Sequence, residues 1–130
     1  MKNTMEEEIK RWLDQAKAEL KSAKNAIQYK DYYVASFLAQ QAAEKALKAV
    51  LLHAGKGLVK IHNLVTLGRK ADAPSKLLDR CDRLNTVYIE TRYPDIGKEI
   101  PSKKFTLSMS KEDIQVAEEV VKWSKTKISK

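Results

Sequence analysis

The sequence predicts an all-α protein, an up-and-down bundle of four main helices plus one short helix. Apolar residues recur at steps of three and four over most of the 130 residues. Only 4 Gly and 3 Pro interrupt this pattern, which is few for the many turns of an all-β fold. A chain of this length can bury one core, so residues 1–130 are predicted to form a single helical domain.

The first helix is predicted over residues 6–30, where apolar side chains fall on one face. Three glutamates, Glu6 to Glu8, place negative charge in its first turn, where the helix dipole favours it. Lysines on this helix fall largely outside the stripe and are expected to face water. The stripe itself consists of Ile9, Trp12, Leu13, Ala16, Leu20, Ala23 and Ile27.

The second helix is predicted over residues 32–54, with Asp31 as its N-cap. Its apolar stripe is rich in alanine, which lets a neighbouring helix approach closely. Glu44 and Lys48 have the spacing of a favourable i,i+4 ion pair. Glycines after the helix tolerate positive φ and end it. The first two helices should therefore pack antiparallel as a hairpin.

Two more helices are predicted in the middle of the chain. A short one over residues 61–71 is capped by Asn63. A longer one has Pro74 in its first turn and ends near Glu90. The apolar face of this longer helix includes Cys81, so the cysteine is predicted to be a core residue.

The last helix is predicted to start after a loop over residues 92–109, with Ser110 as its cap. Its apolar stripe is widened by Val116, Val120 and Trp123, and residues 46–52 of the second helix show a similar surplus. Apolar surface beyond what one helix contact needs should be buried elsewhere. The surplus predicts a homodimer.

The charge of the chain favours anionic partners. It carries 25 Lys and Arg against 17 Asp and Glu, a net charge of +8, which suits RNA, nucleotides or an acidic protein. The excess is spread evenly along the sequence, so a generally solvated basic surface is the alternative interpretation.

Composition also indicates the compartment. The single cysteine cannot form an internal disulfide, which suits a reducing cytosol. The N-terminal run MKNTMEEEIKRW is charged and lacks the apolar segment of a secretory signal. The apolar run AVLLHAG is too short to span a membrane. We therefore expect a soluble cytoplasmic protein that does not enter the membrane.

Three motifs follow one another in an order that packing alone does not require. They are YYVASFLAQQAAEKALKAVLLHAG, then HNLVTL, then TRYPD ahead of a final helix that carries a tryptophan. Polar residues recur in QQAAEKALKA and RYPD at defined positions. With these motifs, the chain resembles the HEPN domain family from about Trp12 to Trp123.

The resemblance implies a helical bundle that commonly forms homodimers and is often encoded beside a minimal nucleotidyltransferase, as a toxin–antitoxin-like pair. Many HEPN domains are metal-independent ribonucleases with an Arg-x(4–6)-His motif, which the dimer brings together in two copies. Others are catalytically silent and serve as nucleotide-binding or interaction modules.

Arg92 is the arginine that matches this motif, but no histidine follows it. The expected positions hold Gly97, Lys98 and Glu99, and the only histidines, His53 and His62, precede Arg92. Histidine is the side chain that exchanges a proton near neutral pH, so no catalytic residue is assigned. The resemblance, taken without the paired histidine, implies a dimeric, nucleotide- or RNA-associated partner of a nucleotidyltransferase. A ribonuclease that pairs Arg92 with Lys98 or His62, and a stand-alone nucleotide-binding module, are the alternatives.

The candidate binding residues are Arg92 and Tyr93 together with a polar face of the second helix. Arg92 would hold a phosphate and Tyr93 would stack on a base. The helix face, about two turns long, consists of Gln41, Lys45 and Lys48 at positions i, i+4 and i+7. The alternatives are that this face is solvated, and that Arg92 and Asp95 form an ion pair that closes the turn at Pro94, with Tyr93 half in the core.

His62 is the secondary candidate. It precedes Asn63 in a loop that could approach residues 92–109, or it could bond locally and help to place Asn63. One cysteine and two separated histidines lack the spacing of a zinc site, and the sequence has no glycine-rich phosphate loop. No metal or cofactor is predicted.

Overall fold

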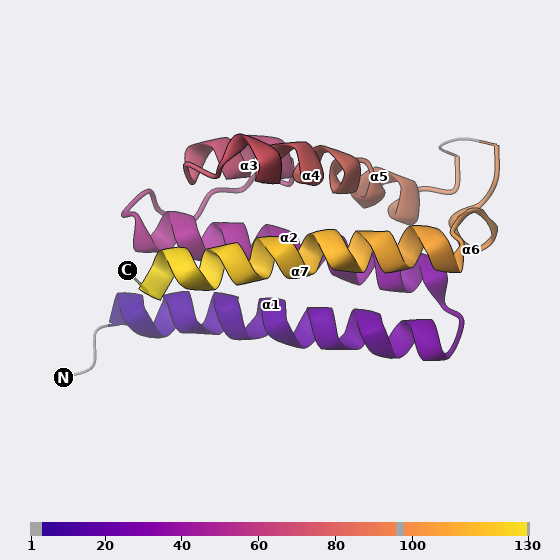
Figure 1. Cartoon of the computed structure of the whole chain (residues 1–130), viewed down its shortest axis with the longest axis horizontal. Coiled ribbons are helices and arrows are strands. Elements are labelled where there is room, and N and C mark those ends of the chain that lie inside the picture. The colour runs from indigo at the N-terminus through magenta and orange to yellow at the C-terminus, as the bar shows by residue number, and fades with distance from the viewer. Residues whose placement is uncertain (1–3, 96–97, 130) are drawn as a thin grey trace.

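The computed structural model describes residues 4–95 and 98–129, and these residues form seven α-helices (Figure 1). The predicted all-α bundle is confirmed, since no strand occurs in the described residues. Gly97, one of the positions compared with the ribonuclease motif, lies outside them. The helices are α1 (Thr4–Gln28), α2 (Tyr32–His53), α3 (Leu64–Lys70), α4 (Ser75–Asn85), α5 (Val87–Arg92), α6 (Pro101–Lys104) and α7 (Leu107–Ser129).

The predicted hairpin of the first two helices is confirmed, and α1 runs antiparallel to α2 (Figure 1). The turn between them includes Lys30, which adopts a positive φ of 62°. Asp31 occupies the N-cap position of α2 as predicted, but its side chain makes no capping hydrogen bond. Its backbone carbonyl instead accepts the first helical bond, from Ala35 N at 2.9 Å.

Helix α2 is the centre of the bundle. It packs against α1, α7, α3 and α5, so helices cover it on several sides (Figure 1). All six alanines of its predicted stripe are fully buried, which is consistent with close approach of its neighbours. The apolar residues of 46–52, Val116 and Val120 are buried within the single chain as well. Most of the surplus that predicted a homodimer is therefore buried inside the chain, and only Trp123 of that set is partly exposed.

The predicted helix from Pro74 to Glu90 is divided at Thr86 into α4 and α5. The apolar spacing continues from Leu84 to Tyr88, so the sequence did not reveal the break. Thr86 keeps helical dihedral angles, φ −72° and ψ −20°, which leaves α4 and α5 as successive helices in one layer (Figure 1).

The last helix begins earlier than predicted. Residues 101–104 of the expected loop form α6, and α7 starts at Leu107. Thr106 caps α7, since its Oγ1 accepts a hydrogen bond from Met109 N at 3.2 Å. Ser110, the predicted cap, is instead buried inside the helix, and its hydroxyl donates to the carbonyl of Tyr32 at 2.6 Å. Within residues 4–95 and 98–129, no helix is both long and apolar enough to cross a membrane.

Candidate functional site

Arg92 and His62 meet at one aromatic ring. The Cζ atom of Arg92 lies 4.4 Å from the centre of the Tyr88 ring. The imidazole of His62 stacks on the same ring, with centroids 4.5 Å apart and planes inclined by 14°. Phe37 of α2 also contributes, with its ring centre 5.5 Å from Arg92 Cζ. We call Arg92, Tyr88 and His62 the Tyr88 cluster.

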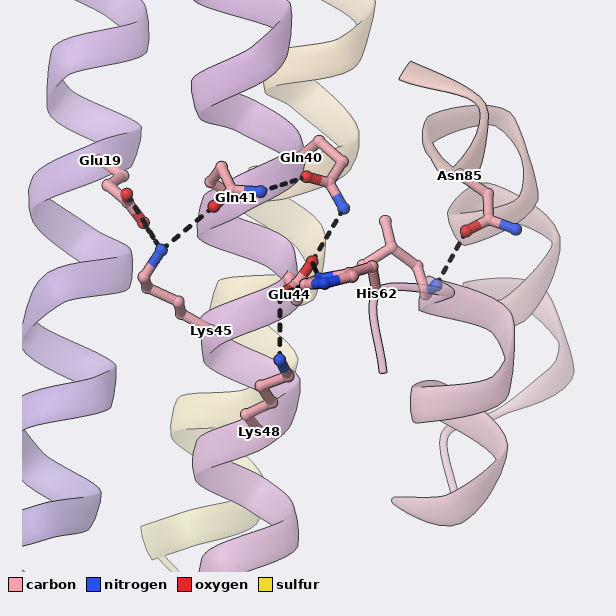
Figure 2. Close-up of polar contacts among 9 residues, drawn as sticks. Glu19, Gln40, Gln41, Glu44, Lys45, Lys48, His62 and Asn85 are labelled. Carbon is pink, nitrogen blue, oxygen red and sulfur yellow. Dashed lines mark hydrogen bonds and ion pairs between the residues drawn. The ribbon is translucent and has the colours of Figure 1, made fainter. Parts of the chain in front are cut away.

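Local structure explains why these side chains meet. Tyr88 and Arg92 are one helical turn apart on α5, so they share a face. His62 directly precedes the cap of α3, where Asn63 Oδ1 accepts from Thr66 N at 3.0 Å, which confirms the predicted cap. The first amide of α3, Leu64 N, donates to Asn85 Oδ1 at the end of α4 at 2.9 Å (Figure 2). This bond fastens the start of α3 beside α4, so His62 is held close to α5.

The other partner of His62 is a buried carboxylate on α2. The Nδ1 atom of His62 lies 3.0 Å from Glu44 Oε2 and 3.2 Å from Oε1 (Figure 2). The side chain of His62 is 52% exposed, whereas that of Glu44 is 7% exposed. A local bond that only places Asn63 was one of the two interpretations of His62, and the structure instead joins His62 to a distant helix.

Glu44 is held in its ionised form by its neighbours. Burial acts to raise the pKa of this carboxyl, but hydrogen bonds from Lys48, His62 and Gln40 outweigh it and lower the pKa below its ordinary value. An ionised carboxylate can only accept hydrogen bonds, so His62 Nδ1 carries a proton and donates it. The opposite ring atom, Nε2, is not needed for this bond and is left for other partners.

Lys48 does not lie on a solvated face. Its Nζ donates to Glu44 Oε2 at 3.0 Å, which confirms the predicted pair, but the residue is only 6% exposed. The amine also lies 5.9 Å from the centre of the Trp12 ring. Lys48 follows Phe37 by eleven positions, which is about 16 Å along the axis of α2. The amine of Lys48 thus contacts Glu44 and Trp12 rather than Arg92. Glu44 and His62 connect it to the ring over which Arg92 lies.

Lys45 points away from the Tyr88 cluster, and Gln41 lies between Lys45 and Gln40 (Figure 2). Lys45 Nζ reaches across to Glu19 of α1, 2.9 Å from Oε1, on the side of α2 opposite to Glu44 (Figure 2). Gln41 accepts from Lys45 at 3.4 Å and donates to Gln40 Oε1 at 2.7 Å. Since α2 is central, its polar residues bond to each other and to adjacent elements.

The alternative interpretation of the turn after α5 was an ion pair between Arg92 and Asp95 that closes the turn. No ion pair joins Arg92 to Asp95 in the part of the chain that the structure describes, and both residues are exposed. Arg92 lies over aromatic rings instead. Tyr93 ends α5 and is 47% exposed, so its ring is open to a ligand beside Arg92.

Metal and thiol chemistry are not indicated by the described residues. Within 4–95 and 98–129, no three His, Cys, Asp or Glu side chains gather in a way that would hold a metal ion. Cys81 is fully buried in the core, as predicted. Burial raises the pKa of its thiol to about 11, which keeps it protonated and unreactive near neutral pH.

The chemistry open to this site is anion binding and proton exchange. The guanidinium of Arg92 offers several N–H donors that suit a phosphate. The imidazole of His62, aligned through Nδ1 by Glu44, presents Nε2 as a group that can accept or donate a proton. Sequence reasoning found Arg92 and His62 but missed Tyr88 and Glu44. The i,i+4 spacing of Tyr88 and Arg92 was the one available signal, since Glu44 and His62 lie on separate elements.

Comparisons with known proteins agree with this architecture. The model of the HEPN domain matches residues 9–128. The chain is similar to the crystal structure of TT1696 from Thermus thermophilus, with 31% identity, a TM-score of 0.85, and coverage of 92% of this chain and 97% of that one. It is also similar to ST0689, an archaeal HEPN homologue, with 31% identity, a TM-score of 0.81, and coverage of 98% and 99%.

A HEPN domain protein from Thermotoga maritima shares the fold at 23% identity and a TM-score of 0.75, with coverage of 92% of this chain and 98% of that one. A search of curated proteins found no match. Because the family model spans nearly all of the described helices, this chain belongs to the HEPN domain family.

Proposed function

We propose that this HEPN domain binds a phosphate of a nucleotide or RNA at the Tyr88 cluster. The observation that carries the proposal is the meeting of the exposed Arg92 and the half-exposed His62 at one ring. A guanidinium binds phosphate oxygens in a bidentate way. Tyr93, exposed next to Arg92, supplies a ring on which a base can stack.

A nucleotidyltransferase partner is the second part of this proposal. We propose that residues 1–130 act as a single domain within a homodimer, paired with a minimal nucleotidyltransferase in a toxin–antitoxin-like system. Family membership supports the partner and the dimer. Exposed apolar side chains at the α5–α7 end give further support for the dimer, namely Ile89, Ile100 and Leu107.

Two measurements test these assemblies. Pull-down with the product of the adjacent gene should recover a complex at micromolar concentration, and failure to do so would contradict the partner. Light scattering should give twice the chain mass. A particle of 14.8 kDa over a wide concentration range would contradict the homodimer.

The binding site is tested by Arg92→Ala. Removing a charged hydrogen-bond donor should weaken binding by about 1.5–3 kcal/mol, which is roughly tenfold to a hundredfold in the dissociation constant. Calorimetry with ATP, GTP and a short RNA measures this loss, and circular dichroism checks the helix content. Arg69→Ala removes another exposed arginine, at the end of α3, and serves as the matched control. Equal losses in the two variants, or none in Arg92→Ala, would refute the site.

Metal-independent RNA cleavage is a second candidate function, and one contact favours it. His62 Nδ1 is held by Glu44, which aligns the ring and leaves Nε2 for a substrate. His62 Nε2 would take the proton of an RNA 2′-hydroxyl as its oxygen attacks phosphorus, and Arg92 would stabilise the charge that grows on the phosphate. The P–O5′ bond would then break, which leaves a 2′,3′-cyclic phosphate, and the departing 5′-oxygen would take a proton from water or from the His62 imidazolium. The chain lacks the Arg-x(4–6)-His motif, so His62 would stand in for the missing histidine from another element.

Cleavage of RNA in the presence of EDTA tests this candidate. The activity should be lost in both His62→Ala and Arg92→Ala and retained in His53→Ala, since His53 lies in the last turn of α2. If the purified chain does not cleave RNA but binds it through Arg92, the binding function stands without the ribonuclease.

A further inference from the structure

A groove between α1 and α7 gathers lysines from both helices. Its volume is about 530 Å³, and five of its lining residues are lysines, three from α1 and two from α7. The two helices run antiparallel along the lower part of the bundle (Figure 1). The lysines are Lys17, Lys21, Lys24, Lys122 and Lys125.

Most of this charge is not neutralised by the protein. Lys24 Nζ pairs with Glu118 Oε2 at 3.0 Å, and both side chains are about half exposed. No ion pair joins the other four lysines to a carboxylate within residues 4–95 and 98–129, and all four are exposed. The basic residues are spread evenly along the sequence, but antiparallel packing of α1 on α7 places these together in space.

Like charges at i,i+4 on one helix repel each other, and lysines facing them across a groove add to the repulsion. A bound polyanion would relieve this cost. The floor of the groove is formed by Leu20 and the buried Val121, and no aromatic side chain lines it. A groove of this kind offers charge for phosphates and apolar surface for sugars, but no platform on which a base can stack.

We infer that the α1–α7 groove binds the phosphate backbone of single-stranded RNA without regard to sequence. Lysine amines bind phosphate as point charges and carry no information about the base. Lys17 and Lys24 are about 10 Å apart along α1, so the groove faces more than one phosphate. Because cations line both walls, the ligand must enter between two helices, which suits a single strand better than a duplex or a bilayer surface.

This inference extends the proposed function, since it supplies a second contact for RNA, but it uses different residues on another face of the bundle. The α1–α7 groove lies away from α3, α4 and α5, the layer that holds Tyr88 and Arg92 (Figure 1). The two sites can therefore be removed one at a time.

The experiment is a fluorescence anisotropy titration of labelled single-stranded RNA at several salt concentrations. Binding should weaken with a slope of about −0.7 in log K against log salt for each phosphate contacted. Lys21→Gln/Lys125→Gln should therefore reduce the slope by about 1.4, and weaken binding by at least about tenfold at low salt, for RNA of any sequence. The control is Lys70→Gln/Lys76→Gln, which removes two exposed lysines of α3 and α4 and should change the slope little.

Each outcome decides the inference. Equal loss in the groove variant and the control would overturn it, because binding would then depend on total charge alone. Duplex RNA or anionic vesicles that bind as tightly, with the same dependence on Lys21 and Lys125, would overturn the single-strand assignment. If Arg92→Ala weakens mononucleotide binding while the groove variant changes nothing, only the groove fails. If the groove variant weakens RNA binding while Arg92→Ala changes neither RNA nor mononucleotide binding, the groove stands and the proposed Tyr88 site fails.

Discussion

Glu44→Gln should be among the most destabilising conservative substitutions in this protein. Glu44 is 5% exposed and lies between Lys48, Gln40 and His62. Glutamine keeps the shape of the side chain and can still accept from Gln40 and His62. It removes the negative charge, however, and Lys48 is left as a buried ammonium without a counter-ion.

The expected loss follows from the contact distance. At the 3.0 Å between Lys48 Nζ and Glu44 Oε2, an effective dielectric constant of about 20 gives an attraction of about 5.5 kcal/mol. Removing one partner of a buried pair costs about 3–5 kcal/mol, because the remaining charge stays buried. Replacing both partners with uncharged residues avoids this cost, so Glu44→Gln/Lys48→Met should recover most of the loss, with the methionine packing near Trp12.

Urea denaturation measures the free energy of unfolding of each variant. The matched control is Glu118→Gln, the same substitution in the Lys24–Glu118 pair, whose side chains are 51% and 47% exposed. An exposed pair contributes at most about 1 kcal/mol. A loss below about 1 kcal/mol in Glu44→Gln, or no recovery in the double variant, would refute the view that Lys48 needs its counter-ion.

Three further predictions concern stability. The pKa of Glu44 in the folded chain lies below its ordinary value of 4.5, so the unfolded chain takes up the proton first as pH falls. The stability from this carboxylate is therefore present above about pH 4.5 and should be lost below it. Urea midpoints measured across the acid range would detect this loss, and Glu44→Gln should not show it. Leu47→Ala should cost about 2–5 kcal/mol, because Leu47 is fully buried, and a loss under about 0.5 kcal/mol in urea would contradict its place in the core. Asn63→Ala should cost about 0.5–2 kcal/mol, since Thr66 N loses its acceptor, and an unchanged thermal midpoint would contradict the cap.

Much of the fold could be predicted from the sequence because the residues on the buried face of a helix recur as apolar residues every three or four positions. The stripe of residues 6–30 and the alanines of residues 32–54 identified α1 and α2, and one polar residue before an apolar run identified the cap at Asn63. The ordered motifs around QQAAEKALKA and RYPD indicated the family. They also drew attention to Arg92, although its surroundings could not be derived from them.

The candidate site was decided by contacts between elements that are distant in the sequence. Arg92 and His62 meet at the ring of Tyr88, and a hydrogen bond from Leu64 to Asn85 joins the start of α3 to the end of α4 beside them. Lys48 shares a polar face of its helix with Gln41 and Lys45, a pattern typical of exposed residues. It is buried nevertheless, because α2 lies at the centre of the bundle. Helical periodicity determines which residues of one helix share a face, so the sequence by itself determined the helices and their apolar stripes. Which polar side chain faces which across two helices depends on their relative position, and only the tertiary structure decided that.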